Sequence, residues 1–401
     1  MAAQRLTNFP RLYKTLDANE LDGVIGTSAE NVVYLSGFWA MTQWARRTPQ
    51  TYVLMPGQGK GKAAIVTSSG LIDLIADQKP WVDDVRRYGY FQLDRNESVT
   101  LCDKDLAQLR LMETPEYAGP VEALVAAIRD NGLERGKLGI DEVSISVQCF
   151  DQLRDALPDV TFVRSASLLQ RVRAVKTPEE ISRLRRAAQI GEMSIDAAFA
   201  ISAEGVSELD FMREFNRTTV NHDGLPVSIC IGFGERSAMS NVQPSERALK
   251  IGDAIRFDVG GRYQHYRSDI SRCGFFGEPG EQIRRYHNAL YRGVLRAYDI
   301  IKPGVVVSDV FNAVMETVRT EGLSHYQRNH VGHGIGIDGY DYPNVAPNEK
   351  GVLEEGMVLC IETPYYELGL AGLQVEDMLL VTADGAETFM STDGALRIIE
   401  P

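Results

Sequence analysis

The sequence lacks the features that attach a protein to membranes or to nucleic acid. It has no run of about 18 apolar residues, and its start, MAAQRLTNFPRLYK, lacks the apolar core and small-residue cleavage site of a secretory signal. The formal net charge of −13 opposes nonspecific binding to nucleic acid or anionic lipid, because both need a basic surface. We therefore expect a cytoplasmic protein with no nucleic acid and no membrane among its partners.

Cysteine is also scarce, with five residues and no C-x-x-C pair among them. An odd, scattered set argues against both a disulfide framework and a thiolate zinc site. We expect these side chains to be small buried hydrophobic groups. They are Cys102, Cys149, Cys230, Cys273 and Cys360.

The length of 401 residues exceeds the ~250 to 300 residues beyond which single cores usually split, so two domains are expected. Short β-branched runs such as DGVIGT, TYVLMP, AAIVTS and KLGIDE alternate with helical stretches in the first part, which is typical of an α/β domain. We place the boundary so that the domains cover residues 1–165 and 166–401. Soon after it, Thr177, Pro178 and Glu180 form the capping-box pattern of a long helix.

The second domain contains two stretches of similar layout, about a hundred residues apart. Each has a long amphipathic helix, over residues 179–201 and 282–301, followed by a glycine turn. A second helix then begins, which we expect Ser207 to cap in the first stretch and Ser308 in the second. Each stretch continues into a β-hairpin that carries two carboxylates.

The four carboxylates of these hairpins are the first candidates for a functional site. GDAIRFD ends in Asp258 and GMVLCIE ends in Glu362, while Asp269 and Glu376 follow after the turns. A pseudo-twofold arrangement of the two stretches would bring all four acids into one space. Clustered carboxylates raise one another's pKa, so they remain ionised at neutral pH only if cations neutralise them. The alternative is that they are not clustered and are ordinary strand-end residues.

A histidine completes this set. The stretch NHVGHGIGIDGYDYP adds His333, which lies between glycines that permit an irregular loop. One imidazole with four carboxylates makes a hard, mostly oxygen site, suited to manganese, iron, cobalt or zinc. The motifs FDVGGRYQHYRSDISR, GHGIG, IETPYY and QVEDMLLVT, in this order, resemble those of the pita-bread superfamily of Xaa-Pro aminopeptidases, prolidases, methionine aminopeptidases and creatinases. ELDGVIGTSAENVVYLSGF is similar to the opening of the accessory domain in that superfamily.

The resemblance covers nearly the whole chain and implies an α+β fold. A C-terminal pita-bread domain of duplicated helix-helix-hairpin units would follow an α/β, creatinase-like N-terminal domain. The resemblance also implies two divalent metal ions that activate a water molecule for hydrolysis of a C–N bond in a dipeptide or similar small amide. Glu362 would shuttle a proton to the leaving nitrogen. The implied metal ligands are Asp258, Asp269, His333, Glu362 and Glu376.

Two histidines that contact substrate in the peptidases of this superfamily have no counterpart here. Asn241 stands in the segment of the first, and Tyr340 stands near the position of the second. Both side chains can donate a hydrogen bond to an oxyanion, but neither titrates near neutral pH as histidine does. The change favours an ectoine-hydrolase-like or creatinase-like small-molecule hydrolase, or a dimethylsulfoniopropionate-lyase-like enzyme, as the alternative function. His330 is a further pocket candidate, with a loop-stabilising hydrogen bond as the other interpretation.

In the N-terminal domain, GFWAMTQWARRTPQTYVLM contains Trp39, Arg46 and Arg47. In creatinase-like relatives this loop reaches the active site of a second subunit, where an arginine can bind a substrate carboxylate. A plain exposed loop is the alternative. The resemblance also implies a homodimer. Some pita-bread domains are protein-interaction modules that have lost metal ligands, whereas this sequence keeps all five, so we expect an enzyme.

Overall fold

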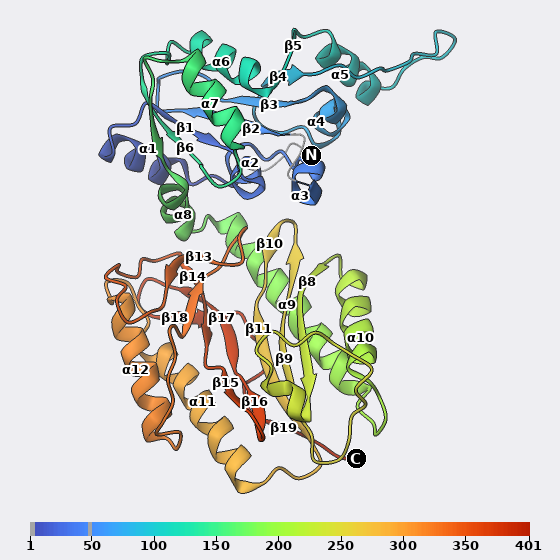
Figure 1. Cartoon of the computed structure of the whole chain (residues 1–401), viewed down its shortest axis with the longest axis vertical. Coiled ribbons are helices and arrows are strands. Elements are labelled where there is room, and N and C mark those ends of the chain that lie inside the picture. Colours follow the sequence, from blue (N-terminus) through green and yellow to red (C-terminus); the bar gives the residue numbers. More distant parts are fainter. Residues whose placement is uncertain (1–4, 47–49) are drawn as a thin grey trace. The chain divides into compact units, whose positions relative to one another are not determined.

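The computed structural model describes residues 5–46 and 50–401 of the chain. The chain divides into two compact units, Met1–Val172 and Arg173–Pro401, each built around its own β-sheet (Figure 1). The boundary expected from the sequence falls shortly before this division, directly ahead of helix α8 (Ala166–Ala174). Among the described residues, no helix is both long enough and apolar enough to cross a membrane.

The N-terminal unit is an α/β domain around a seven-stranded sheet of order β5-β4-β3-β2-β1-β6-β7. The pairs β1–β2 and β2–β3 are antiparallel and the other four pairs are parallel. The strands are β1 (Gly23–Gly26), β2 (Tyr52–Pro56), β3 (Ala64–Ser68), β4 (Asp84–Tyr88), β5 (Glu116–Tyr117), β6 (Lys137–Ile140) and β7 (Thr161–Arg164). The helices before α8 are α1 (Phe9–Ala18), α2 (Ala29–Ser36), α3 (Met41–Arg46), α4 (Ile72–Gln78), α5 (Asp103–Met112), α6 (Pro120–Asp130) and α7 (Val147–Ala156).

The central strands of this sheet are buried on both faces, which explains why their sequences are continuous apolar runs. Ile25 and Leu54 pack in one core with Leu124 and Ile128 of α6. The residues that alternate with Ile25 and Leu54 along β1 and β2 face the other side of the sheet, where α2 contacts both strands. Ser28 caps α2 by accepting a hydrogen bond from a first-turn backbone N–H.

The C-terminal unit contains a ten-stranded sheet with the central order β10-β9-β11-β17-β14-β12-β13, to which β8, β18 and β19 add. Figure 1 shows one helix pair beside each half of this sheet, α9 with α10 and α11 with α12. These helices are α9 (Pro178–Ala200), α10 (Glu208–Asn221), α11 (Glu281–Ile300) and α12 (Val307–Thr320). The strands are β8 (Leu225–Phe233), β9 (Ala254–Tyr263), β10 (Tyr266–Arg267), β11 (Ile270–Phe276), β12 (Gly332–Gly334), β13 (Asp341–Asn344), β14 (Val358–Glu362), β17 (Glu376–Val381), β18 (Ala386–Thr388) and β19 (Arg397–Ile399), and a separate pair is β15 (Tyr365–Glu367) with β16 (Ala371–Leu373).

The internal duplication expected from the sequence is visible in matching backbone hydrogen bonds. The N–H of Gly205 donates to the carbonyl oxygen of Leu249 at 2.9 Å, and the N–H of Gly304 donates to that of Leu353 at 2.8 Å. Each half then forms an antiparallel pair, β9 with β11 and β14 with β17. The pairing of β11 with β17 joins the two halves. The duplicated pita-bread fold is therefore confirmed.

The helix starts agree with the sequence at two of three positions. Thr177 and Glu180 form the expected capping box of α9, and Ser207 caps α10. The expectation for Ser308 is wrong, because α12 begins at Val307, after a cap residue without a side-chain hydrogen bond. The position equivalent to Ser207 is Val306, which bridges Val352 as Ser207 bridges Ala248, so Ser308 lies inside the first turn of α12.

The expectation for the cysteines is only partly correct. Cys230, Cys273 and Cys360 are buried, but Cys102 is exposed and Cys149 is half-buried. Cys102 immediately precedes α5, whose helix has no buried residue, so its first turn offers no core to a preceding side chain. All five are free thiols.

Candidate metal centre

Strand alternation turns two of the four acids toward the same face of the sheet. In β14, Leu359 and Ile361 pack in the core with residues of α11 and α12, so Cys360 and Glu362 point to the opposite face. Glu362 lies directly across from Glu376 in the β14–β17 pair. Two carboxylates from one half of the duplicated unit therefore lie side by side.

The other hairpin supplies the remaining two acids. Ser271 of β11 lies opposite both Asp258 of β9 and Glu376 of β17, so the two hairpins meet at this residue. One carboxylate oxygen from each of Asp258, Asp269 and Glu376 lies within 4.8 Å of the others. The structure thus brings together acids that are more than a hundred residues apart in the sequence.

Burial and mutual repulsion disfavour ionisation of this cluster. Burial raises the pKa of Asp258, and burial together with the charges of Asp258 and Glu362 raises the pKa of Asp269 well above its usual value. For the same two reasons, the pKa of Glu362 rises to about 7 and that of Glu376 rises well above normal. Such carboxylates are ionised at neutral pH only beside compensating positive charge.

His333 aims a lone pair at these acids. Its Nδ1 lies 3.0 Å from the carbonyl oxygen of Gly334, and because a carbonyl only accepts, Nδ1 carries the proton. Its Nε2 lies 3.9 Å from Oδ2 of Asp269 and 3.9 Å from Oε1 of Glu376. This atom is buried and has no hydrogen-bond partner among residues 5–46 and 50–401. Burial lowers the pKa of His333 to about 4, so the ring stays neutral.

A buried imidazole lone pair that faces two carboxylate oxygens at 3.9 Å, beyond hydrogen-bond distance, fits a cation between the three groups. The donors are mostly carboxylate oxygens with one imidazole nitrogen, which suits hard or borderline divalent metals. The protein residues therefore fit a divalent metal site, and the proposed ligands are the five side chains singled out from the sequence.

Arg256 and Gln374, which the sequence pattern did not single out, donate hydrogen bonds to acids of this cluster. Nη1 of Arg256 donates to Oδ2 of Asp258 at 3.3 Å and to Oε1 of Gln374 at 3.0 Å. Nε2 of Gln374 in turn donates to Oε2 of Glu376 at 3.3 Å. Each bracing residue precedes its acid by two positions, as Cys360 precedes the acid at the end of β14. The period of two along a strand was the available signal for finding them.

His330 and Tyr340 both lie against the centre. Nδ1 of His330 is 3.2 Å from Oε1 of Glu362. The Tyr340 ring stacks on the His333 ring, with centroids 3.9 Å apart and planes inclined by 22°. Tyr340 is 61% exposed, but its partial burial first, and then the neighbouring acids, raises its pKa, so its hydroxyl stays protonated and can donate a hydrogen bond.

Asn241 lies on the segment before β9 and does not contact the acids within the described part of the chain. It is exposed, and its side-chain Nδ2 donates to Oγ of Ser240 at a long 3.5 Å. Arg256 donates to the carbonyl oxygens of Met239 and Ser240, which ties this segment to the brace of the cluster. These contacts therefore link Asn241 to the proposed ligand Asp258 through Ser240 and Arg256.

The remaining candidates belong to the N-terminal unit. Trp39 is half-buried, and its backbone N–H and carbonyl are both held by the side chain of Gln78, at 2.8 and 3.0 Å. Arg47 lies outside the described residues, as does the side chain of Arg46. Their expected role in substrate binding stays a prediction.

Comparison with known families agrees with this geometry. The family model of metallopeptidase family M24 matches residues 182–383, and that of the creatinase/prolidase N-terminal domain matches residues 9–175. The chain belongs to metallopeptidase family M24. Members of this family are metallopeptidases that use divalent metals, and the matched region contains all five proposed ligands.

Solved structures similar to this M24 chain share the fold across both units. They include the Xaa-Pro dipeptidase from Bacillus anthracis (TM-score 0.80, 23% identity, 98% of this chain and 99% of that one) and dipeptidase PepE from Mycobacterium ulcerans (TM-score 0.79, 21% identity, 98% and 97%). An uncharacterized peptidase of Staphylococcus aureus strain USA300 is 30% identical over 221 residues, or 55% of this chain. The matched region spans 63% of that relative.

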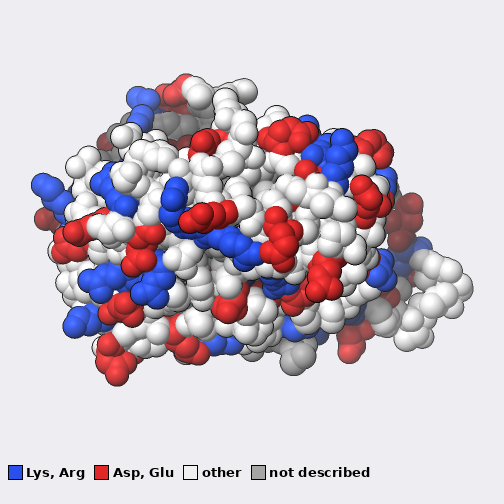
Figure 2. All heavy atoms as spheres, turned by 90° about the horizontal axis from the view of Figure 1, so that it is seen from below, with Lys and Arg blue, Asp and Glu red and all other residues white. Residues whose placement is uncertain are grey.

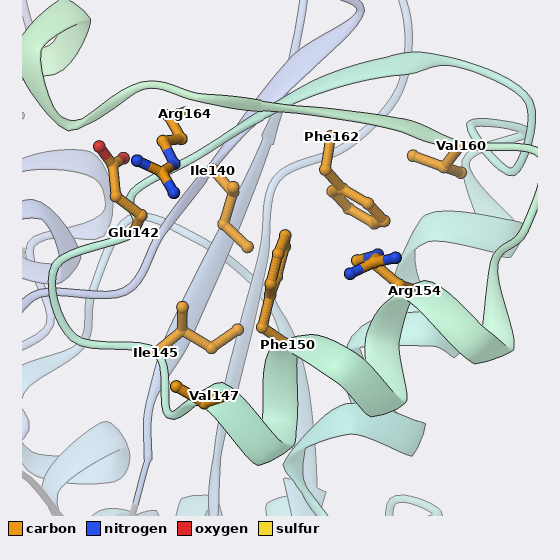
Figure 3. Close-up of a pocket in the computed structure, with 9 residues that line it drawn as sticks. All are labelled: Ile140, Glu142, Ile145, Val147, Phe150, Arg154, Val160, Phe162 and Arg164. Carbon is orange, nitrogen blue, oxygen red and sulfur yellow. The ribbon is translucent and has the colours of Figure 1, made fainter.

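A pocket of about 590 Å³ in the N-terminal unit of the M24 chain has a different character (Figure 3). Its wall is mostly apolar, and the rings of Phe150 and Phe162 meet edge to face with centroids 5.9 Å apart. Its lining contains neither histidine nor cysteine, and a single carboxylate.

On the face that Figure 2 shows, acidic and basic side chains alternate, without a continuous basic surface for nucleic acid. The metal centre is therefore the better candidate for chemistry.

Proposed function

We propose that the chain is a dinuclear metal-dependent hydrolase that cleaves a C–N bond in a dipeptide or similar small amide, as Xaa-Pro dipeptidases do. The ligands are Asp258, Asp269, His333, Glu362 and Glu376, and the metals are two ions of manganese, cobalt, iron or zinc. The observation that carries the proposal is the unpartnered Nε2 of His333, 3.9 Å from a carboxylate oxygen on each of two acids.

When bound, the metals would act as Lewis acids and lower the pKa of a water molecule. The side chains of the protein supply the proton transfer. Glu362 lies beside the proposed metals, so its carboxylate can take a proton from the water and pass it toward the leaving nitrogen. His330 lies 3.2 Å from this carboxylate and limits its orientation. The protonated hydroxyl of Tyr340 donates to negative charge that develops on the substrate.

Metal dependence and substrate class are tested together. Chelation should abolish hydrolysis of Xaa-Pro dipeptides, and manganese or cobalt should restore it. Asp269→Ala should lose activity while retaining its far-UV circular dichroism, and Asp299→Ala, a change at an exposed residue of α11, should retain activity. A fully active Asp269→Ala enzyme would contradict the proposal.

A second candidate keeps the metals and changes the substrate. It is favoured by Asn241 and Tyr340, which replace two groups able to transfer protons at neutral pH. The enzyme would then be an ectoine-hydrolase-like or creatinase-like hydrolase, or a dimethylsulfoniopropionate-lyase-like enzyme. A screen of ectoine, creatine and dimethylsulfoniopropionate beside the dipeptides separates the two candidates. Turnover of one of these compounds without dipeptide cleavage would select the second.

A binding module without catalysis is the third possibility, and protein purified from metal-supplemented medium without bound metal would support it. We also carry forward a homodimer and a cytoplasmic location as predictions of the proposed function. Light scattering of the purified chain tests the first, and cell fractionation tests the second.

A further inference from the structure

The loop between α12 and β12 presents two buried polar atoms without hydrogen bonds in the described part of the protein. They are the hydroxyl of Tyr326 and Nε of Arg328. Nδ1 of His330, in the same loop, already faces Oε1 of Glu362 at 3.2 Å. Tyr326 is only 1% exposed, and its backbone is held by bonds to Leu323 and from Arg319, both 2.9 Å long. Buried polar groups nearly always have partners, so this concentration of unused donors indicates a ligand.

Arg328 is the charged member of this group. Its guanidinium carbon lies 5.9 Å from the ring centre of Tyr366, and it makes neither an ion pair nor a hydrogen bond with any described residue. It is nevertheless close to the metal centre, because the hydroxyl of Tyr366 donates to Oε1 of Gln374 at 3.3 Å, and Nε2 of Gln374 donates to Oε2 of Glu376 at 3.3 Å.

Arg256 provides an internal comparison, because it approaches the same Tyr366 ring at 5.0 Å. Its guanidinium is fully used, with hydrogen bonds to backbone carbonyls, Gln374 and Asp258. Two arginines thus flank one aromatic ring, and the protein satisfies only one of them. The other keeps its planar set of N–H donors for a group from outside.

We propose that Arg328 and the hydroxyl of Tyr326 form a subsite for the carboxylate of the substrate, which makes the substrate a small amide with a free carboxylate. A carboxylate matches the guanidinium plane through two parallel hydrogen bonds, and the phenol adds a third donor. The inference rests on the proposed function for the meaning of "substrate". The subsite itself is defined by these side chains alone.

Arg267 is the competing cation. Its Nε is also buried without a partner among the described residues, and Arg267 precedes the proposed ligand Asp269 by two positions. Arg328 is preferred because the same loop supplies a second unused donor, the hydroxyl of Tyr326, two residues earlier. Its position against an aromatic ring also limits the motion of the guanidinium.

The first experiment uses acetate and acetamide, which differ in charge and hardly in size, on the metal-loaded full chain at constant ionic strength. Acetate at 100 millimolar should raise the Tm by roughly 2 to 4 °C, and acetamide should not. Arg328→Gln should weaken acetate binding about 10- to 100-fold, while Tyr326→Phe and Arg328→Lys should weaken it less. Acetate can bind the metals directly in the wild type and in every variant. The difference between the acetate effects on the wild type and on Arg328→Gln therefore measures the contribution of the arginine.

Three results would overturn the subsite. These are no acetate effect in the wild type, an equal effect in Arg328→Gln, or a loss in Arg267→Gln with none in Arg328→Gln. The exposed Arg296→Gln is the matched control and should behave as the wild type. Arg328→Lys serves as the test variant if the glutamine variant does not fold.

The second experiment links the subsite to turnover. With a cleaved dipeptide and its C-terminal amide, Arg328→Gln should lower kcat/KM for the free acid about 10- to 100-fold, mainly through KM, and leave the amide unchanged. Equal losses for both compounds would contradict carboxylate recognition. Failure of the proposed function appears separately, as absence of any C–N cleavage while the acetate effect persists.

Discussion

Replacing Arg256 by methionine should destabilise the C-terminal unit strongly. The side chain is fully buried, and it donates to the carbonyl oxygens of Ser237 at 2.9 Å and Met239 at 2.7 Å. It also lies 3.3 Å from Oδ2 of Asp258, whose side chain is 23% exposed and would lose its nearest positive charge. Removal of one partner from a buried ion pair costs about 3 to 5 kcal/mol of unfolding free energy. Because water partly screens Asp258, we expect a loss at the lower end of that range.

Urea unfolding with two probes measures this loss. All three tryptophans, Trp39, Trp44 and Trp81, lie in the N-terminal unit, so their fluorescence reports that unit alone, whereas circular dichroism reports both. The dichroism transition should shift to lower urea in Arg256→Met with little change in fluorescence. Arg256→Lys should be intermediate, because an ammonium group cannot reach all of the acceptors. A loss below about 1 kcal/mol, the value of an exposed pair, would refute the reasoning.

The remaining predictions concern a buried histidine and a glycine. Burial, with Arg272 second, lowers the pKa of His287 from 6.5 to about 4, so the folded state resists its protonation. The contribution of His287 to the free energy of unfolding should therefore be fully present above pH 6.5, and about 3 kcal/mol should be lost as the pH falls toward 4. His287→Phe should flatten this part of a plot of unfolding free energy against pH. An unchanged slope would exclude His287 as its source. In Gly332→Ala, the new Cβ would stand 2.2 Å from the carbonyl oxygen of Cys360, at a φ of 148°. This change should displace the neighbouring His333 and reduce both metal affinity and Tm, whereas Gly280→Ala, where a Cβ meets nothing, should leave metal affinity unchanged.

Features encoded by neighbouring residues were predictable from the sequence. The capping box of Thr177 and Glu180 needs only three consecutive helical positions, so its pattern specifies the start of α9. The meeting of the four acids was predictable for a different reason. Duplication places equivalent hairpins about a pseudo-twofold axis, so their carboxylates face each other.

Features that depend on the partner across space were missed. Ser308 has the residue type of a helix cap, but α12 begins one residue before it and Val306 holds the cap position. Arg328 has no motif, because its significance lies in the absence of a partner among the described residues, which a sequence does not reveal. Arg256 and Gln374 were predictable in part. Strand periodicity places them on the same face as the acids, but their hydrogen bonds join segments far apart in the sequence.

Metal stoichiometry tests the central claim most directly. Plasma mass spectrometry and calorimetric titration of the purified chain should find two divalent ions per chain. His333→Ala should lose at least one of them, because Nε2 of His333 is the only nitrogen among the proposed ligands. His325→Ala, at an exposed histidine that contacts Tyr365, should retain both. A chain that binds no divalent metal, or a His333→Ala variant with the same stoichiometry and affinity as the wild type, would contradict the account.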